Sequence, residues 1–485
     1  MRPPRTTRQS RRNFMTTRID APAASGAVGS KGQPLPSGIW SLSALSEAVD
    51  AGFITKVLLV AADNSGRPLG EHVPARRFLD HVGDYTKFRI PLMVWQLDIE
   101  QDLNPDLEHV GGLSTGGPDC YLKPDLNTLR VLPWIPGTAF VICDPVLIDG
   151  TTLEIAPRQI LKRQLERLAA HGATAQVASE LEFYLFDQSY EDGWRSNYQD
   201  LTPASRYQAA YDPLVAINNE PFINAVVEQM ERAGVEIEGL SCEYGLGQQE
   251  INLTHTNALD MADRHFIYKF GVKAIATRMG LSATFMAKWD AAGLGSSCHI
   301  HTSLWSTDGS TPLGDSALFD GFVAGLVDDA REMCLTYAPN LNSYRRFQPN
   351  SFAPTTVACG DDNRTLSFRS IGEGPTRRVE NRIPGADVNP YIAIAGAIAA
   401  GVNGIERCLP FPELVSGDGY LRTDLPQLPR SLTQAIELFA SSESAKTAFG
   451  SEVHAHLLTV GHGETSAFLN QAVTDWERRR YFERT

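Results

Sequence analysis

The spacing of apolar and polar residues changes along the chain, and these changes divide it into three parts. Residues 1–35 are rich in Pro, Gly, Ser and Ala and show neither helical nor strand periodicity. Residues 36–148 contain short strand-like runs, of which the first is the apolar run 56–61, followed by turn-forming residues. We therefore expect a disordered basic tail over 1–35, a small α+β domain over 36–148 and a larger domain over 149–485.

The larger domain has patterns typical of helices mixed with mostly antiparallel strands. Pro157 is suited to the first turn of a helix, and Gly172 is suited to the end of that helix. Asn389 is suited to cap a later, wholly apolar helix, and Pro390 to occupy its first position. Alternating segments indicate strands. The expected elements are helices at 157–171, 205–235, 259–280 and 391–402, and strands at 174–186, 248–254, 283–288 and 298–305. The predicted fold class is α+β.

Charge and hydropathy limit the possible partners. The formal net charge is −14, so a general nucleic-acid or anionic-membrane binder would suffer like-charge repulsion. The longest apolar stretch, 391–402, is well short of the roughly 20 residues that a membrane helix needs. We expect small-molecule partners, no nucleic acid and no membrane.

The seven cysteines are scattered and include no C-x-x-C pair. This spacing argues against a disulfide framework or a thiolate metal site, and it favours a reducing, cytoplasmic location. The N-terminal segment Ser10-Arg11-Arg12-Asn13-Phe14-Met15 resembles a twin-arginine export signal, but no apolar stretch follows it. A transit peptide would share the Arg-rich composition; a disordered tail, with Met15 as the initiator, is the simpler interpretation.

Two predicted strands carry chemically active side chains at every second position. Glu180 and Glu182 share one face of the strand at 174–186, and His299, His301 and Ser303 share one face of the strand at 298–305. A single E-x-E pair would most simply face water. Because the pattern recurs on several strands, we interpret the shared face as the wall of a polar funnel.

A glycine-rich loop separates two further acids, Glu243 and Glu250. A loop that returns into the strand at 248–254 would bring these carboxylates together. The loop lacks the third glycine and the following helix of a dinucleotide-binding motif. The chain also has no G-x-x-x-x-G-K-[ST] sequence, so bound ATP would need metals and arginines around its phosphates.

Five carboxylates and an imidazole form a donor set that suits hard divalent cations. Oxygen ligands with one imidazole favour Mg²⁺ or Mn²⁺, whereas zinc sites usually contain more nitrogen or sulfur ligands. Without cations, the clustered carboxylates would repel one another strongly. The candidate ligands are Glu180, Glu182, Glu243, Glu250, His299 and Glu380.

Seven arginines and no lysine occur between positions 345 and 382. Guanidinium groups bind phosphate and carboxylate oxygens in a bidentate manner that lysine cannot match. Alternation also places Arg378, Glu380 and Arg382 on one strand face. Taken singly, each arginine could instead be a surface or ion-pair residue. The seven are Arg345, Arg346, Arg364, Arg369, Arg377, Arg378 and Arg382.

These motifs, in this order, resemble the glutamine synthetase family over nearly all of the chain after the tail. The matching stretches are S-E-L-E-F, E-Y-G-L-G-Q-Q-E, H-I-H-T-S, N-S-Y-R-R-F-Q-P, D-N-R-T-L-S-F-R, R-V-E-N-R and N-P-Y. The resemblance implies a β-grasp domain over 36–148 and a catalytic domain over 149–485. It also implies a homo-oligomeric ring, a dodecamer in the family, with active sites between subunits.

The resemblance implies a role for each site residue in an ATP-dependent ligation of L-glutamate to an amine through γ-glutamyl phosphate. One metal would be held by Glu182, Glu243 and Glu250, and a second by Glu180, His299 and Glu380. ATP contacts would come from His301, Ser303, Arg364, Arg369 and Arg378, glutamate contacts from Gly295, Arg346 and Arg382, and catalytic contributions from Arg364, Glu380 and Arg382.

One departure from the family pattern concerns the amine. Ammonia-using members carry a flap glutamate in the context P-G-x-E-x-P, whereas Phe352 occupies the acid's place here. An apolar residue suits the carbon part of a larger amine, so the pattern resembles the γ-glutamylamide branch, whose substrates are polyamines, ethanolamine or alkylamines. The alternatives are an ammonia-using glutamine synthetase and a non-catalytic structural or regulatory homologue. The residues leave the identity of the amine open.

Overall fold

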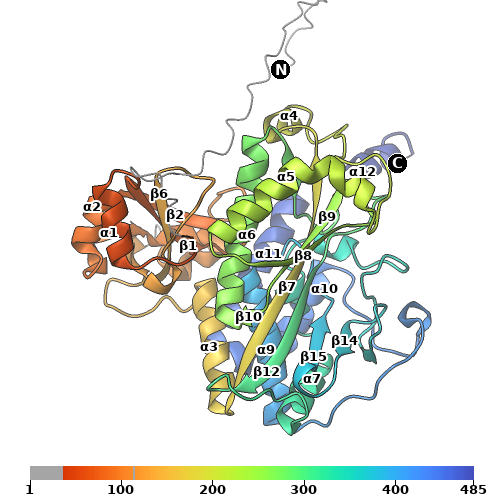
Figure 1. The fold of residues 1–485 in the computed structure, drawn as a ribbon. Coiled ribbons are helices and arrows are strands. Elements are labelled where there is room, and N and C mark those ends of the chain that lie inside the picture. Colours follow the sequence, from red (N-terminus) through yellow and green to blue (C-terminus); the bar gives the residue numbers. More distant parts are fainter. Residues whose placement is uncertain (1–36, 113–114, 485) are drawn as a thin grey trace, which may run out of the picture. The chain divides into compact units, whose positions relative to one another are not determined.

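The computed structural model describes residues 37–112 and 115–484. The predicted disordered tail and the position of Met15 therefore lie outside the described residues. The described residues from 37 onward form one compact unit. Two sheets organise it, one built from the first hundred or so of these residues and one from the rest (Figure 1).

The first sheet has six strands in the order β2-β1-β6-β4-β3, with β5 paired to β6. Strand β1 is buried at every position except Lys56, and it pairs in parallel with β6 and antiparallel with β2. The expected strand at 56–61 is confirmed. The elements are α1 Leu42–Asp50, β1 Lys56–Ala62, β2 Pro68–Pro74, α2 Ala75–His81, β3 Arg89–Pro91, β4 Asp119–Pro124, β5 Arg130–Val131 and β6 Thr138–Val146.

The second sheet has nine strands in the order β13-β14-β15-β12-β7-β9-β8, with β10 and β11 also paired to β7. All its pairings are antiparallel except β13 with β14. The strands are β7 Ala173–Phe186, β8 Ile237–Cys242, β9 Gln248–Leu253, β10 Thr256–Asn257, β11 Ser282–Thr284, β12 Cys298–Ser306, β13 Cys359–Asp361, β14 Phe368–Ile371 and β15 Arg378–Asn381. The prediction of a mostly antiparallel sheet is confirmed.

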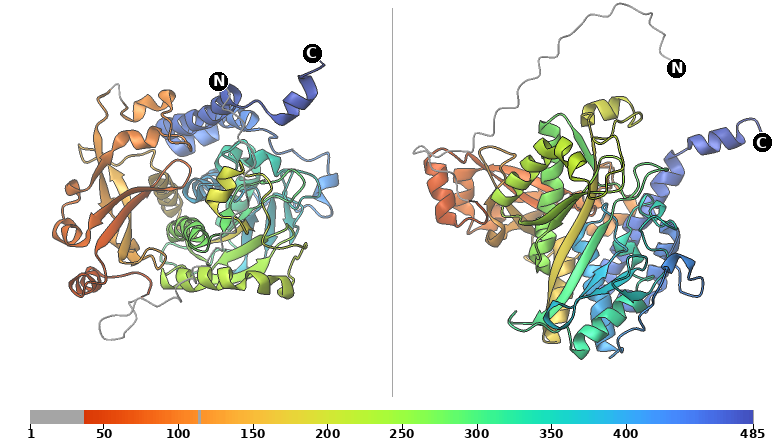
Figure 2. Two further views of the ribbon diagram at one scale, coloured as in Figure 1. Left: turned by 90° about the horizontal axis from the view of Figure 1, so that it is seen from above. Right: turned by 45° about the vertical axis from the view of Figure 1, so that its right-hand side comes forward.

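Helices cover the second sheet, and α6 lies between the two sheets (Figures 1 and 2). Helix α9 is buried from Pro390 to Ile405, and Asn389 caps it by accepting a hydrogen bond from the Tyr391 N–H. The helices are α3 Pro157–Ala170, α4 Tyr190–Arg195, α5 Pro213–Arg232, α6 Ala258–Arg278, α7 Ala317–Asp328, α8 Cys334–Tyr337, α9 Pro390–Glu406, α10 Leu432–Ser441, α11 Glu443–Gln471 and α12 Asp475–Tyr481.

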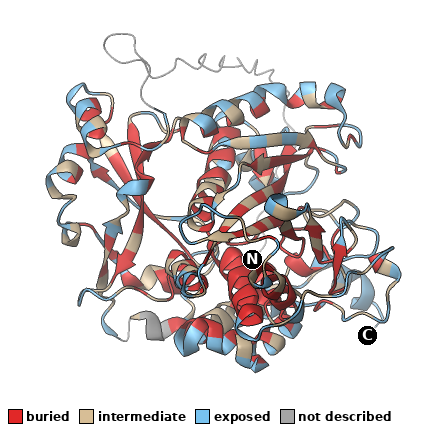
Figure 3. Cartoon of the chain, turned by 60° about the horizontal axis from the view of Figure 1, so that its bottom comes forward, coloured by how far each residue is buried: buried red, intermediate tan, exposed pale blue. Residues whose placement is uncertain are grey.

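Short 3₁₀ helices connect several of these elements, and buried residues concentrate in the strands and the inner helices (Figure 3). Among the described residues, no helix combines the length and the apolar character that crossing a bilayer would require. The 3₁₀ helices are η1 Tyr85–Lys87, η2 Leu92–Gln96, η3 Pro105–Val110, η5 Leu126–Thr128, η6 Ser343–Arg345, η7 Gly374–Thr376 and η8 Gly419–Leu421.

Two predicted elements are longer than the observed ones. The helix expected from residue 205 begins only at Pro213, because the Asp212 side chain caps it there by accepting from Leu214 N–H and proline occupies the first helical position. The strand expected over 283–288 ends at Thr284. There the Thr284 hydroxyl accepts a hydrogen bond from Met286 N–H, and the chain bends away from β7.

Candidate active site

Strand register brings four of the five predicted acids and both histidines onto one face of the nine-stranded sheet, while Glu243 lies in the loop between β8 and β9. Strands β9, β7, β12, β15 and β14 are consecutive neighbours, and each contributes at least one polar side chain at matched height. This is the funnel wall that the two-residue periodicity predicts. The paired positions are Glu250 with Glu182, Glu180 with His299, and both His301 and Arg369 with Glu380.

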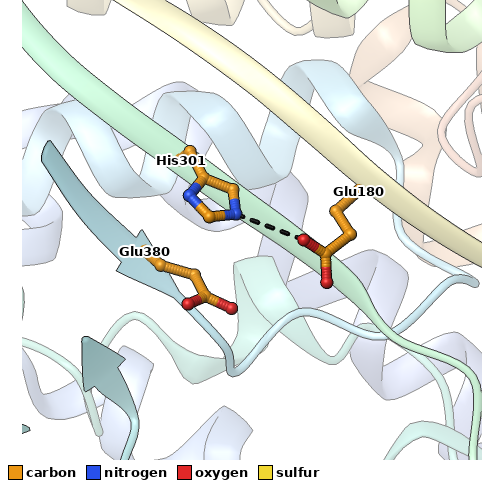
Figure 4. A group of neighbouring side chains, drawn as sticks. All are labelled: Glu180, His301 and Glu380. Atoms are coloured by element: carbon orange, nitrogen blue, oxygen red, sulfur yellow. Dashed lines mark hydrogen bonds and ion pairs between the residues drawn. The ribbon is translucent and has the colours of Figure 1, made fainter. Parts of the chain in front are cut away.

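Glu180, His299, His301 and Glu380 form a paired cluster at the centre of this face. His299 Nδ1 lies 2.7 Å from Glu180 Oε1 and 3.3 Å from Glu380 Oε1. His301 Nε2 lies 3.4 Å from the other Glu180 oxygen. Ligand atoms of Glu180, His301 and Glu380 all lie within 4.8 Å of one another, close enough to share one metal ion (Figure 4).

Positive neighbours stabilise the charged form of both acids in the paired cluster. Burial alone would raise the pKa of Glu180, but His299 and His301 lower it well below its usual range. Burial also opposes ionisation of Glu380, yet His299, Arg382 and His301 lower its pKa to about 2. The Arg382 Nη1 donates to Glu380 Oε1 at 2.5 Å, and Arg369 Nη1 donates to Oε2 at 2.9 Å. Arg369 and Arg382 thus balance the charge of Glu380 from within the protein.

Glu182, Glu243 and Glu250 form an acid cluster beside it, and there the electrostatics are reversed. Burial raises the pKa of Glu243 to about 7, and repulsion from Glu182 adds to this effect. Burial and the charges of Glu180, Glu182 and Glu243 raise the pKa of Glu250 to about 9. Glu243 and Glu250 therefore both resist ionisation, which supports their predicted convergence.

Two residues that the sequence motifs did not single out hold Glu182 in place. Ser297 donates to Glu182 from its backbone N–H, at 2.9 Å, and from its hydroxyl, at 2.5 Å. Gln248 Nε2 donates to Glu182 Oε2 at 2.8 Å and to the Gly295 carbonyl at 3.0 Å. Gln248 and Glu250 alternate on β9, so the same two-residue spacing could have indicated Gln248.

The two clusters fit hard divalent cations. Their donors are carboxylate oxygens and imidazole nitrogens, the set that Mg²⁺ and Mn²⁺ accept. His299 Nε2 and His301 Nδ1 are buried and have no hydrogen-bond partner among the described residues. The motif comparison assigned His299 to a metal and His301 to the nucleotide. The structure brings both rings to Glu180, and the division of roles between them stays a prediction.

Arg346 and Arg382 lie buried behind the clusters. Arg346 donates to the carbonyls of Ile383, at 2.8 Å, and Arg382, at 2.9 Å. Gly295 packs directly on Arg346, because a Cβ at that position would lie 2.6 Å from its Cγ. The three predicted glutamate contacts are therefore brought together.

The predicted nucleotide contacts are more dispersed. Arg369 is shared between Glu380 and Asp362, whose oxygen accepts from Arg369 Nε at 2.7 Å. The Ser303 hydroxyl accepts from the Trp305 indole N–H at 3.1 Å. Arg364 is exposed. Arg378 contacts the carbonyl of Thr376 at 3.5 Å, and no described hydrogen bond or ion pair joins it to either cluster. Its role at the nucleotide stays a prediction.

An aromatic rim borders the acid cluster. The ring of Phe352 lies 5.9 Å from the ring of Tyr244, which follows Glu243 in the chain. Phe352 has a φ of +60°, and its side chain is 55% exposed. Its carbonyl accepts from Arg382 Nη2 at 3.2 Å. The backbone of Phe352 is therefore held at the site by Arg382, while its exposed ring is accessible for contact with a ligand.

Comparisons with known proteins agree with this geometry. A family profile described as "Glutamine synthetase, catalytic domain" matches residues 154–481. The chain is 44% identical over 454 residues to the gamma-glutamylethanolamide synthetase GlnA4 of Streptomyces coelicolor, covering 93% of this chain and 96% of that protein. It is 36% identical to the glutamate–isopropylamine ligase of a Pseudomonas species, covering 89% and 95% of the two chains.

A solved structure shares the fold over most of the chain. The structure described as "GmaS/ADP complex-Conformation 1" superposes with a TM-score of 0.79 at 28% identity, and the match covers 90% of this chain and 99% of that one. Together with the family profile and the two ligases, it leads to one conclusion: the chain belongs to the glutamine synthetase family, on its γ-glutamylamide branch.

Proposed function

We propose that the protein joins the γ-carboxylate of L-glutamate to a small carbon-bearing primary amine, with ATP as co-substrate. Family membership and the two similar ligases support this reaction class. The observation that carries the choice of amine is the Phe352–Tyr244 ring pair beside the acid cluster. It stands where ammonia-using members of the family place an acid.

The reaction proceeds in two displacements. A γ-carboxylate oxygen of glutamate attacks the γ-phosphorus of ATP, forming γ-glutamyl phosphate and releasing ADP. The alkylammonium loses one proton to become a neutral amine, whose nitrogen attacks the acyl carbon. The nitrogen then loses a second proton, and inorganic phosphate leaves with the bonding electrons. A carboxylate is a poor acyl donor until one oxygen carries phosphate, so activation must come first. The anionic partners need positive charge around them to approach each other.

The chain supplies this positive charge in two ways. Arg346 and Arg382 orient glutamate next to Gly295, and Arg364 and Arg369 face the phosphates. Bound Mg²⁺ would supply Lewis-acid neutralisation of the phosphate oxygens. Glu182, Glu243 and Glu250 would hold one ion. Glu180 and Glu380, with an imidazole from His299 or His301, would hold the other.

The rim of the site suits a neutral or hydroxyl-bearing carbon chain on the amine. Phe352 and Tyr244 offer aromatic faces, which attract alkylammonium groups. Burial raises the pKa of the Tyr211 phenol, and the charges of Glu250 and Glu243 add to this effect, so Tyr211 is electrostatically close to the acid cluster. A phenol near this cluster could hydrogen-bond to the hydroxyl of ethanolamine. We therefore favour ethanolamine and short alkylamines over a diamine, which would need an acid at the far end of the pocket.

The proposal also covers the domain division, the assembly and the location of the protein. Residues 36–148, with the six-stranded sheet and helices α1 and α2, serve as the β-grasp domain, and the chain from 149 is the catalytic domain. The protein assembles as a homo-oligomeric ring with shared active sites. It works in the cytoplasm, a location consistent with seven free cysteines.

An ADP-release assay with a panel of amines tests the proposal. With glutamate, ATP and Mg²⁺, ethanolamine and isopropylamine should give faster turnover than ammonia, and mass spectrometry should detect the γ-glutamylamide. Putrescine serves as the diamine control. Ammonia as the best substrate would refute the proposed amine class. Absence of ADP release with every amine would favour the non-catalytic alternative.

A further inference from the structure

A cavity of about 730 Å³ lies between the six-stranded sheet and helices α6 and α11, apart from both clusters. Its volume is in the range of small-molecule sites, about 300–1,000 Å³. Its lining is mainly apolar, with side chains from β1, α6 and the segment after β11, including Leu58, Val60, Phe266, Phe270 and Phe285. None of the residues assigned to glutamate, ATP or metal lines it.

One wall of this cavity carries unpaired positive charge. Lys269 and Lys273 form no ion pair with any described acid, and both ammonium groups lie over the Phe285 ring, at 5.5 and 5.8 Å. Lys269 donates to the carbonyls of Ala386 and Val388, which leaves one N–H free. Burial, and then repulsion by Lys273, lowers the pKa of Lys269 to about 8. An anionic group would relieve this repulsion.

The cavity also carries unpaired negative charge. Asp98, Asp387 and Glu464 line it, and none of them forms an ion pair with a described cation. Asp387 Oδ1 is buried without a hydrogen-bond partner among the described residues. Burial, followed by repulsion from Asp98, raises the pKa of Glu464. An ammonium group would neutralise this wall.

Asp387 attracts Lys269 without forming an ion pair with it, and this attraction opposes part of the fall in the lysine pKa. Charges of both signs on an apolar cavity thus define the chemistry of the ligand. A carboxylate on the ligand would pair with the lysines, and an ammonium group would pair with the acids. An apolar body would fill the space between the aromatic and aliphatic side chains. We propose that this cavity is an effector site for a small zwitterion with an apolar body, the chemical class of the apolar α-amino acids.

Three cavity-lining segments lead directly to the proposed glutamate contacts. Phe285 and Met286 precede Ala287, whose carbonyl accepts from Ser296 N–H at 2.9 Å beside Gly295. Asn340 and Asn342 precede Arg346. The third segment, with Asp387, follows Arg382 by five residues.

These segments are also cross-linked. Asn342 accepts from Lys288 N–H and donates to the Lys288 carbonyl, both at 2.8 Å. Asp387 Oδ2 accepts from Asn340 Nδ2 at 2.9 Å and from the Ser343 hydroxyl at 2.6 Å. A ligand that bridges the two charged walls would restrain all three segments. Occupancy should therefore lower the KM for glutamate, an effect that rests on the proposed function.

Calorimetry with L-leucine as the probe tests the site directly. Leucine should bind the wild-type protein, and Lys273→Met and Glu464→Gln should each weaken binding by at least about tenfold, roughly 1.4 kcal/mol. Lys446→Met and Glu452→Gln, exposed positions on α11, are the matched controls and should leave the affinity unchanged. Lys273→Arg should retain binding. 3-Methylbutylamine and 4-methylpentanoate, which each lack one charge, should bind more weakly than leucine.

The outcomes separate this inference from the proposed function. Binding of leucine with the same affinity to the wild type and to Lys273→Met would overturn the site, because leucine would then occupy the glutamate position. Absence of any binding would also overturn it. In the ADP-release assay, leucine should lower the KM for glutamate of the wild type but not of Lys273→Met. If no amine supports ADP release, calorimetry still decides whether the cavity binds the zwitterion.

Discussion

The two halves of the site face differ in how their negative charge is balanced. In the paired cluster, His299, Arg369 and Arg382 contact Glu380, and its pKa is held at about 2. In the acid cluster, none of the three carboxylates forms an ion pair within residues 37–112 and 115–484, and the pKa of Glu250 rises to about 9. In the first half the protein's own cations balance the charge of Glu380, and in the second half Glu243 and Glu250 retain protons more readily than ordinary carboxyl groups. The acid cluster is therefore where metal ions should matter most.

Loss of an acid from the cation-dependent half should have the largest effect. Glu182→Ala removes the carboxylate that Ser297 and Gln248 position. We expect turnover to fall by about 1,000-fold, since metal neutralisation contributes several kcal/mol to the transition state. The measurement is ADP release at saturating substrates. Glu166→Ala, an exposed acid on α3, should retain full activity, and equal activity in the two variants would point to a scaffold.

Loss of a cation from the paired cluster should destabilise the fold. Arg382→Ala leaves the buried Glu380 without one of its partners, so the free energy of unfolding should fall by about 3 kcal/mol. Denaturant titration of the metal-free protein measures it. Arg422→Ala breaks the exposed pair with Asp424 and should cause no measurable change. Equal stability of the two variants would show that Glu380 does not need Arg382.

An acid at the aromatic rim should move specificity toward ammonia. Phe352→Glu replaces an apolar ring with a carboxylate able to bind NH₄⁺ and accept its proton. The ratio of kcat/KM for ammonia to that for ethanolamine should rise about tenfold, or roughly 1.4 kcal/mol. Phe482→Glu, at a highly exposed C-terminal position, is the control. An unchanged ratio would remove Phe352 from the amine site.

The pH dependence of stability should also distinguish the two halves. Folding raises the pKa of Glu250 from 4.5 to about 9, so the native state binds this proton more tightly. Its contribution is complete below pH 4.5 and disappears as pH rises through about 9. Between pH 7 and 9.5 the Tm of metal-free protein should fall by about 2 °C more than that of Glu250→Gln. Glu238→Gln is the control and should follow the wild type.

Local periodicity was sufficient to predict which of these side chains share strand faces. Glu180, Glu182, His299 and His301 were placed on shared strand faces by two-residue spacing, and β7 and β12 pair Glu180 with His299 as expected of neighbouring strands. The helix cap at Asn389 also followed from local chemistry. Such features depend on residues only a few positions apart, so one sequence suffices to indicate them.

Long-range partners could not be predicted in the same way. Ser297 lies 115 positions from Glu182, and nothing in its local pattern links the two. The start of α5 at Pro213 depended on a cap that competed with an apparently continuous helical pattern. The cavity beside α6 arises from segments more than 400 positions apart, from β1 to α11. These features depend on tertiary packing, which periodicity does not encode.

Titration of the metal-free protein with Mn²⁺, followed by electron paramagnetic resonance, tests the central claim most directly. The account predicts two tightly bound ions per chain, with protons released on binding because Glu250 must ionise. Glu250→Gln should lose one ion and that proton release while keeping the other ion. Binding of Mn²⁺ that is weak, or that is the same in Glu250→Gln as in the wild type, would contradict the assignment of the acid cluster to a metal.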